Sequence, residues 1–427
     1  MNVNGIIAEY NPFHNGHKYQ LEESVRLTNA DFTVVVMSGN FVQRGAPALV
    51  GKRLRTEMAL RCGADLVLEL PVLYATASSE YFAAGAVALL HKLGVVTHLC
   101  FGSECGDTAK LQQIAAFLAE EPKAYQTALK QLLKQGLSYP DARAKALRSS
   151  FPDNGTNYDE LLSSPNNILG IDYIKEIVRR QSDMIPVTVK RIGSGYHDTF
   201  PAENLTGISA NCNMPLQPAP VSALAIRQAL YEGQLPAQLH PFMPEEVWPL
   251  LDVYLAENKP LYLDAFSNLL YYKLLLEKEE GYEKYLDVSA WLSNRIRNSL
   301  NSFSGFGSFC DILKTKAITH TRISRCLIHI LLGITKEDMA NGRAQEDTPY
   351  ARMLGFSRSA LPLLRAVKAH SRIPLITRLA DAQKSLPQEA GRLLKQDILA
   401  SEIYKGVAFG GTGRPAPNEF STPLVIV

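Results

Sequence analysis

The chain has 427 residues, of which 46% are hydrophobic and 20% charged, and its formal net charge is +2. A chain of this length and composition can bury sizeable cores, so we expect two domains. Six cysteines in so long a chain exclude a disulfide framework, and no apolar run reaches the roughly 18 residues that a membrane-spanning helix needs. No targeting segment is recognisable, and we therefore expect a cytoplasmic protein.

The N-terminal stretch predicts a strand, a turn and a helix. Gly5–Ala8 is a short apolar run typical of a buried parallel strand, and residues 18–29 have helical spacing. The turn between them contains His14-Asn-Gly16-His17. Unpaired N–H groups at a helix N-terminus bind anions, glycine lets the backbone approach a ligand, and imidazoles can donate to phosphate oxygens. The turn therefore suggests a phosphate site.

Two other interpretations of the turn stay open. His-x-Gly-His can recur by chance as an ordinary turn, or it could form half of a metal site. Local spacing supplies no third metal ligand, and we therefore expect no protein-held metal. The other common phosphate-binding patterns, Gly-x4-Gly-Lys-Ser/Thr and a helix-opening Gly-x-Gly-x-x-Gly, are missing. If a nucleotide binds, the two histidines bind it.

The next two hundred residues alternate strand patterns with helix patterns. Predicted strands cover residues 33–37, 65–70, 95–101 and 186–191, and predicted helices cover residues 53–62, 81–93 and 166–180. This alternation predicts an α/β fold with a Rossmann-like, doubly wound parallel sheet, whose ligand crevice lies beyond the carboxyl ends of the strands. Residues 105–163 are predicted to form a helical insertion. Lys52, Arg53 and Arg55 form a cationic cluster that could flank phosphate or RNA, but the expected default is a solvated helix face.

Beyond residue 235 the strand runs stop and amphipathic helical patterns dominate. We expect residues 1–235 to form the catalytic domain and residues 236–427 a mostly α-helical C-terminal domain. Two stretches of the second domain are basic. In residues 311–334, four cations oppose one acid, and residues 352–378 contain six cations and no acid. Such faces are often only solvated, but two of them in a nearly neutral chain favour a polyanionic partner. The cations that we assign to this partner are Lys314, Lys316, Arg322, Arg325, Arg352, Arg365 and Lys368.

Several motifs resemble known families. A strand ending in His-x-Gly-His and a later Ser222-Ala-Leu-Ala-Ile-Arg227 segment resemble the nucleotidylyltransferase superfamily. Ala223 and Leu224 stand where its second motif has Ser and Thr, so only the roles of Ser222 and Arg227 carry over. Five longer strings together resemble the bacterial tRNA(Met) cytidine acetate ligase family, over nearly the whole length. They are Glu9-Tyr-Asn-Pro-Phe-His-Asn-Gly-His17, Met37-Ser-Gly-Asn-Phe-Val-Gln-Arg-Gly45, Gly63-Ala-Asp-Leu-Val-Leu-Glu-Leu-Pro71, Phe101-Gly-Ser-Glu104 and Ser164-Pro-Asn-Asn-Ile-Leu-Gly170.

This resemblance implies an ATP-dependent ligase. Its substrates would be acetate, activated as acetyl-AMP with release of pyrophosphate, and the wobble cytidine of elongator tRNA(Met), acetylated at N4. Mg²⁺ would accompany ATP, and no protein partner or membrane is implied. The catalytic residues would be His14 and His17. The ATP-binding residues would be Ile7, Ala8, Glu9, Tyr10, Asn11, Pro12, Phe13, His14, Asn15, Gly16, His17, Lys18, Tyr19, Gln20, Gly102, Asn166, Arg191, Ser222 and Arg227.

Two alternative functions remain. The chain could be an adenylyltransferase that joins AMP to a small phosphorylated acceptor, which would leave the basic helical region without a task. It could also be a non-enzymatic RNA-binding protein whose nucleotide site is regulatory.

Overall fold

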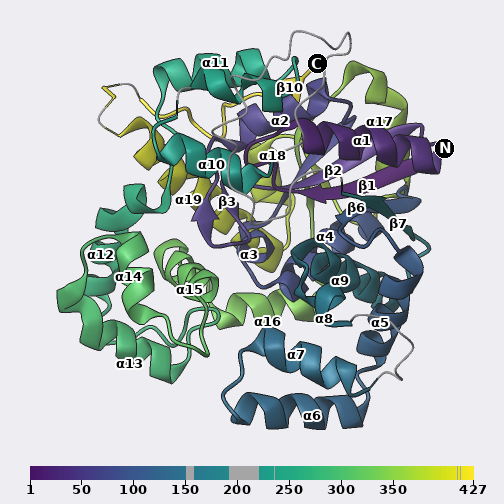
Figure 1. Ribbon diagram of the computed structural model, residues 1–427. Helices are drawn as coiled ribbons and strands as arrows, with labels where there is room; N and C mark the ends of the chain where they lie inside the picture. The colour runs from purple at the N-terminus through teal and green to yellow at the C-terminus, as the bar shows by residue number, and fades with distance from the viewer. Residues whose placement is uncertain (151–157, 192–220, 235, 411, 414) are drawn as a thin grey trace, which may run out of the picture.

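A computed structural model describes residues 1–150, 158–191, 221–234, 236–410, 412–413 and 415–427 (Figure 1). Part of the predicted insertion, residues 151–157, and the predicted domain boundary at residue 235 lie outside these ranges.

The fold is organised around one large sheet with the strand order β10-β8-β5-β2-β1-β6-β7. Five parallel strands confirm the predicted doubly wound core: β1 (Val3–Ala8), β2 (Phe32–Ser38), β5 (Leu66–Leu70), β6 (His98–Ser103) and β7 (Ile185–Lys190). The chain moves from β1 to β2 and β5, then crosses to β6 on the other side of β1. The topological switch point therefore lies between β1 and β6, where such sheets open a crevice at the carboxyl ends of the strands.

Successive side chains along the strands enter two different cores, as the two-residue period of a strand requires. Ile6, Val35 and Val67 join the core on one face, and Ile7, Val36 and Leu68 join the core on the other. The first core is covered by α1 (Asn15–Thr28), α2 (Lys52–Arg61), α10 (Ala223–Tyr231) and α11 (Trp248–Glu257). The second is covered by α3 (Val72–Ala75), α4 (Ser79–Lys92), α5 (Thr108–Glu120) and α9 (Pro165–Arg179).

The chain between β6 and β7 carries the predicted helical insertion. Besides α5 and α9, it contains α6 (Lys123–Lys134), α7 (Tyr139–Arg148) and α8 (Tyr158–Ser163). In Figure 1, α6 and α7 lie at the bottom of the molecule, away from the sheet. The insertion therefore extends from the carboxyl end of β6, where it begins shortly after Ser103, to the bottom of the molecule.

The C-terminal part is mostly helical, but the expectation that strands stop beyond residue 235 is wrong. Strands β8 (Ala351–Phe356), β9 (Leu375–Ile376) and β10 (Val425–Ile426) extend the main sheet, and β8 pairs antiparallel with β5. The helices of this part are α12 (Ser267–Leu276), α13 (Ala290–Ser299), α14 (Phe306–Leu313), α15 (His320–Leu332), α16 (Lys336–Ala344), α17 (Leu361–His370), α18 (Leu379–Ser385) and α19 (Gln388–Phe409). Short 3₁₀ turns cover Pro236–Phe242, Leu263–Phe266, Leu300–Ser302 and Arg358–Ala360. In Figure 1, α12 to α15 form a lobe at the lower left.

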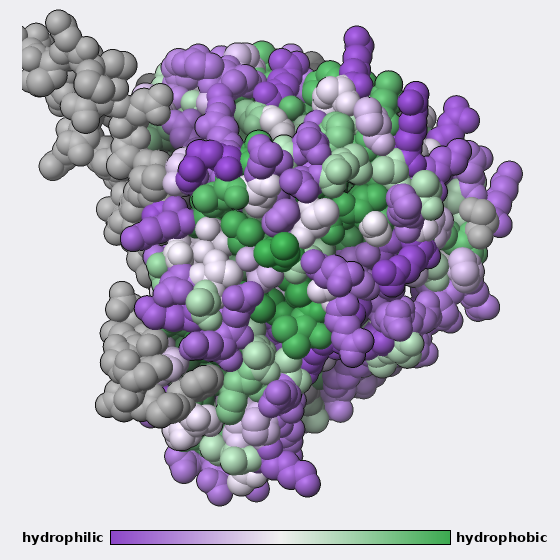
Figure 2. Space-filling model, turned by 90° about the vertical axis from the view of Figure 1, so that its right-hand side faces the viewer, coloured by the Kyte–Doolittle hydropathy of each residue, from purple (hydrophilic) through white to green (hydrophobic). Residues whose placement is uncertain are grey.

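Figure 2 shows the side of the molecule on which α1 and the edge strand β7 lie in Figure 1. Hydrophobic residues gather in the middle of this face and hydrophilic residues surround them. None of the helices in the described ranges combines the length and the apolar content that crossing a bilayer requires.

Candidate ATP-binding crevice

The histidine turn follows β1 directly and forms the N-terminus of α1. His14 is the N-cap of this helix, and its Nδ1 accepts the backbone N–H of Gly16 at 3.0 Å. In return, His17 Nδ1 accepts the backbone N–H of His14 at 3.3 Å. This reciprocal arrangement is a capping box made by two imidazoles instead of a hydroxyl and a carboxylate. The two rings stack with their centroids 3.8 Å apart.

The hydrogen bonds of the two histidines decide their tautomer. Because each Nδ1 accepts a backbone N–H, each neutral ring carries its proton on Nε2. Burial lowers the pKa of His14 to about 3, and the nearby guanidiniums of Arg191 and Arg227 contribute to this shift. Burial, with His14 and Arg191, also lowers the pKa of His17 well below its ordinary value. Both rings are therefore neutral donors at neutral pH, with Nε2–H not used by the cap.

Buried aromatic and polar contacts hold the turn in place. Tyr10 and Phe13 are buried, and their ring centroids lie 5.0 and 5.5 Å from that of His17. The side-chain oxygen of Asn11 accepts the N–H of Leu49 at 2.7 Å. The orientation of the imidazoles thus rests on packing within the first core and does not depend on a bound ligand.

The expected solvation of the cationic cluster at the start of α2 is wrong for two of its three members, whereas Arg53 is partly exposed. Lys52 and Arg55 are buried. Arg55 donates to the carbonyls of Glu9 at 2.6 Å and Ser38 at 3.0 Å, and also to that of Gly39. It therefore joins the loops that follow β1 and β2. Sequence reasoning missed this role, although Arg55 lies three and four residues before Met58 and Ala59, on the apolar face of the helix.

Glu104 and Asn167 fix the end of β6 against the start of α9. The Glu104 carboxylate accepts the backbone N–H of Asn166 at 3.3 Å and that of Asn167 at 3.0 Å, and also the Asn166 side-chain amide at 2.6 Å. The side-chain oxygen of Asn167 accepts from the Ser103 hydroxyl at 2.7 Å. A carboxylate at a helix N-terminus satisfies its free N–H groups. Asn166 is thereby fixed beside the carboxyl end of β6.

The two arginines carried over from the resemblance lie near the histidines. Arg191 follows β7, its N–H donates to the carbonyl of Ser103 at 3.0 Å, and its Cγ would lie 3.6 Å from a Cβ built on Gly102. The Arg227 guanidinium donates to the carbonyl of Asn11. Both guanidiniums act on the pKa of His14. The structure thus brings together the turn after β1, the end of β6, the residue after β7 and α10.

Other residues of the predicted ATP set have structural tasks in this structure. Ser222 is buried and caps α10, because its hydroxyl accepts the N–H of Ala225 at 3.2 Å. Asn15 donates to the carbonyl of Pro241 at 3.0 Å, and Lys18 forms an ion pair with Glu246 at 2.7 Å. Ile7 lies in the second core. Four further members are partly exposed, namely Ala8 of β1, Glu9 just after it, and Tyr19 and Gln20 of α1.

The residues predicted to hold tRNA differ in exposure. Lys314 and Lys316 are exposed beyond the end of α14, and Arg365 and Lys368 are exposed on α17. On α15, Arg322 is partly exposed, and Arg325 has 13% of its side chain exposed.

The assignment of Arg352 to tRNA is wrong. Its side chain is only 2% exposed and lies in ion pairs with Glu69 at 2.9 Å and with Glu419. Position 352 belongs to β8, opposite Glu69 of β5, so its charge faces the carboxylates of the sheet and not the solvent.

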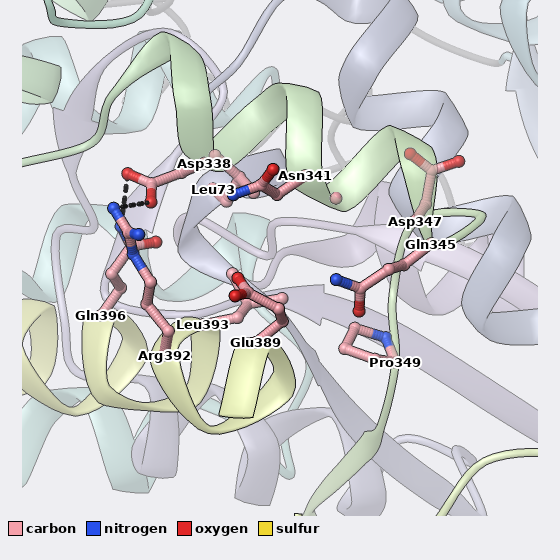
Figure 3. Close-up of a pocket in the computed structure, with 11 residues that line it drawn as sticks. Leu73, Asp338, Asn341, Gln345, Asp347, Pro349, Glu389, Arg392, Leu393 and Gln396 are labelled. Atoms are coloured by element: carbon pink, nitrogen blue, oxygen red, sulfur yellow. Dashed lines mark hydrogen bonds and ion pairs between the residues drawn. The ribbon is translucent and has the colours of Figure 1, made fainter. Parts of the chain in front are cut away.

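A small cavity of about 30 Å³ lies away from this crevice, between α16 and α19 (Figure 3). Asp338 and Arg392, whose closest atoms lie 2.9 Å apart, point toward each other at its end. Its volume holds little more than a water molecule. It is therefore no rival to the crevice as a nucleotide site.

Comparisons with known proteins agree over the full length. A family model described as HIGH Nucleotidyl Transferase matches residues 1–412. The tRNA(Met) cytidine acetate ligase of Acetivibrio thermocellus is 39% identical over 431 residues, covering 100% of both chains. That of Clostridium kluyveri is 39% identical over 436 residues, covering 100% of this chain and 99% of the relative. The crystal structure of Thermotoga maritima TmcAL bound with alpha-thio ATP has a TM-score of 0.88 and 32% identity, with 100% of both chains covered. Its apo form has a TM-score of 0.90, with the same identity and coverage.

Proposed function

We propose a function from the family to which the chain belongs, that of the HIGH nucleotidyl transferases and tRNA(Met) cytidine acetate ligases. The protein activates acetate with ATP and then acetylates N4 of the wobble cytidine in elongator tRNA(Met). The observation that carries this proposal is the pair of neutral imidazoles at the N-terminus of α1, at the switch point of the sheet. Helix N-termini and Nε2–H donors suit phosphate oxygens.

In the proposed complex, the α- and β-phosphates of ATP lie on the turn between His14 and His17. Arg191 and Arg227 lie close enough to His14 to lower its pKa, so they are placed to balance the charge of the outer phosphates. Gly102 leaves room beside the end of β6, and Asn166 is positioned there to bind the ribose or base.

The proposed reaction has two steps. First, an acetate oxygen attacks the α-phosphorus of ATP, the bond from the α-phosphorus to the bridging oxygen breaks, and pyrophosphate leaves. Second, the cytidine N4 amine attacks the acetyl carbon of acetyl-AMP, AMP leaves, and the amine loses a proton. The amine is a weak nucleophile, which explains the need for an activated acyl group. The protein contributes position and charge stabilisation, since no covalent enzyme intermediate is required.

Mg²⁺, when bound with ATP, would neutralise part of the charge of the phosphates. Across the described ranges, no group of three or more His, Cys, Asp or Glu side chains is arranged to hold a metal ion.

One assay separates this function from its alternatives. Purified protein is mixed with ATP and labelled acetate, with and without tRNA, and the products are resolved. We expect acetyl-AMP without tRNA and labelled N4-acetylcytidine with it. An AMP adduct of a small phosphorylated acceptor would favour an adenylyltransferase, and the absence of any product would favour a regulatory nucleotide site.

A further inference from the structure

The hairpin after β2 is not explained by the ATP site. Its strands are β3 (Phe41–Val42) and β4 (Ala46–Pro47), and its turn is Gln43-Arg44-Gly45. The backbone N–H of Gln43 donates to the Glu9 carboxylate at 2.8 Å. Glu9 lies in the segment that leads from β1 to His14. One side of the hairpin is therefore attached to the proposed ATP-binding turn.

The other side of the hairpin packs against α15. The Ser324 hydroxyl donates to the carbonyl of Gly45 at 2.6 Å. Gly45 has a φ of +69°, and a Cβ at this position would collide with the backbone of Arg325. Only glycine combines this backbone conformation with so close an approach. The hairpin thus connects the crevice to the lobe that contains α15 (Figure 1).

Cations gather where the hairpin meets the helix. Arg44 is exposed in the turn, Arg322 is partly exposed, and Arg325 lies 3.9 Å from the Asp287 carboxylate. Burial lowers the pKa of Arg325 against the opposing effect of Asp287, and the guanidiniums of Arg322 and Arg44 add to this lowering. Because a Cβ on Gly45 would meet the backbone of Arg325, the neighbouring Arg44 lies beside α15, the helix that carries Arg322 and Arg325.

We propose that Arg44 and Arg322 form a cationic ledge, with the mostly buried Arg325 behind them, that binds backbone phosphates of the RNA substrate, and that Arg44 positions the reacting nucleotide at the crevice. This inference rests on the proposed function, because it assigns the RNA partner of that reaction to a surface. A guanidinium recognises phosphate with two parallel hydrogen bonds, which fixes direction as well as distance. Unpaired loop nucleotides can be turned out of their stack, so a held phosphate determines where the base reaches.

The expected signature is a separation of the two half-reactions. Arg44→Ala should leave acetate-dependent acetyl-AMP synthesis within about twofold of the unmodified protein, because Arg44 is not part of the ATP crevice. Transfer of acetyl to tRNA should fall about 10-fold or more in kcat/KM, the usual size of a lost charge-assisted contact. The log–log salt slope of tRNA binding should shrink by about 0.7 to 0.9, the value for one phosphate contact.

Two further variants make the test specific. Arg44→Lys keeps the charge but not the planar fork, so it should restore the salt slope and only part of the transfer rate. Arg61→Ala removes another exposed arginine, at the end of α2 and paired with Glu57 at 2.6 Å, and should change neither quantity. Unchanged transfer and salt slope in Arg44→Ala would overturn the inference, and so would a parallel loss of both half-reactions. If the unmodified protein makes no acetyl-AMP, the proposed function fails, but the salt slope still tests the ledge.

Discussion

The two ring nitrogens of His14 have different roles, and a substitution can remove one role while it keeps the other. Nδ1 caps α1 by accepting from Gly16, and Nε2–H is the proposed phosphate donor. Asparagine is also a good N-cap, so His14→Asn should keep the cap and lose the donor, whereas His14→Ala loses both at a cost of about 1 kcal/mol of stability.

For His14→Asn we expect near-normal stability and a fall of about 10²-fold or more in the rate of acetate-dependent ATP–pyrophosphate exchange. Removal of one hydrogen-bond donor to the developing phosphate charge lowers a rate by about this factor. His17→Ala should show a similar loss of exchange. Urea unfolding and exchange kinetics, measured on the same preparations, separate the two effects. Near-normal exchange in both His14→Asn and His17→Ala would refute the assignment of the imidazoles to the phosphates.

Burial of His14 also predicts a pH dependence of folding. Its folded pKa of about 3 lies below the ordinary value of 6.5, so the unfolded chain binds the extra proton between these values. The neutral ring therefore contributes full stability above pH 6.5, and this contribution is lost as the pH falls toward 3. One histidine should lose about 2 kcal/mol between pH 7 and pH 5. Urea unfolding at the two pH values should show a smaller loss in His14→Asn, and equal losses in both proteins would contradict the prediction.

At the scale of elements, the sequence identified those whose pattern was local. The strands β1, β2, β5, β6 and β7 are aliphatic runs between helical patterns, and all five lie where they were expected. Strand β8 was missed because its sequence, Ala351-Arg-Met-Leu-Gly-Phe356, contains no β-branched residue and has a charged residue at its second position. Its pairing with β5 depends on residues almost three hundred positions away, which no local pattern encodes.

The residues of the candidate site also differ in whether a local sequence pattern could predict them. His14 and His17 could be recognised because the cap, the glycine and the helix are adjacent in the chain. Arg55 and Glu104 could not, since their partners are backbone groups of other loops. From the sequence alone, such a charged residue cannot be distinguished from a solvent-exposed one, because its partners lie on loops that are distant in the chain. Sequence reasoning therefore predicted the groups that we propose touch ATP, and it missed the residues that hold the loops.

The contact between the hairpin and α15 depends on Gly45. Gly45→Ala would place a methyl group against the backbone of Arg325 and force alanine into a left-handed conformation. We expect a loss of about 1 to 3 kcal/mol in unfolding free energy, and a larger effect on acetyl transfer than on acetyl-AMP synthesis.

Gly333→Ala is a matched control for this prediction. Gly333 follows α15 with a φ of +72°, and a Cβ there would have no neighbour within 4 Å. It should show the cost of the backbone conformation alone, with both half-reactions unchanged. Equal behaviour of the two variants in unfolding and in catalysis would mean that the hairpin contact adds nothing.

At the scale of the whole molecule, a buried cluster of charges joins the C-terminal part to the sheet. Lys52 lies 2.8 Å from Glu69 and 2.7 Å from Glu419, and Arg352 pairs with the same two carboxylates. Glu419 also lies 3.5 Å from Lys405 of α19. Burial of the charges is expensive, so the cluster is stable only while each charge has its partners.

Arg352→Ala should therefore unfold more easily by about 3 to 5 kcal/mol, because two carboxylates lose a buried partner. Arg365→Ala, at an exposed position of α17, should change the unfolding free energy by less than about 0.5 kcal/mol. Urea unfolding of both variants tests this contrast. A stable Arg352→Ala protein with reduced tRNA affinity would return this residue to the RNA-binding set.

The last prediction concerns the division of labour between the crevice and the basic lobe. Lys314, Lys316 and Arg322 are at least partly exposed, whereas Arg325 is mostly buried and lies near Asp287. Replacing only the first three with alanine therefore tests RNA contact with little risk to the fold. If all three contact phosphates, the log–log salt slope of tRNA binding should shrink by about two to three units, at roughly 0.7 to 0.9 per contact.

Acetyl-AMP synthesis by this triple variant should be unchanged, because none of the three side chains contributes to the turn after β1 or to the ends of β6 and β7. Lys314 already pairs with Asp311 at 2.8 Å, so its share of the slope should be the smallest, and restoring it alone should recover little. Unchanged tRNA binding in the folded variant would remove this lobe from the RNA surface. A parallel loss of acetyl-AMP synthesis would instead mean that the lobe supports the crevice through the hairpin.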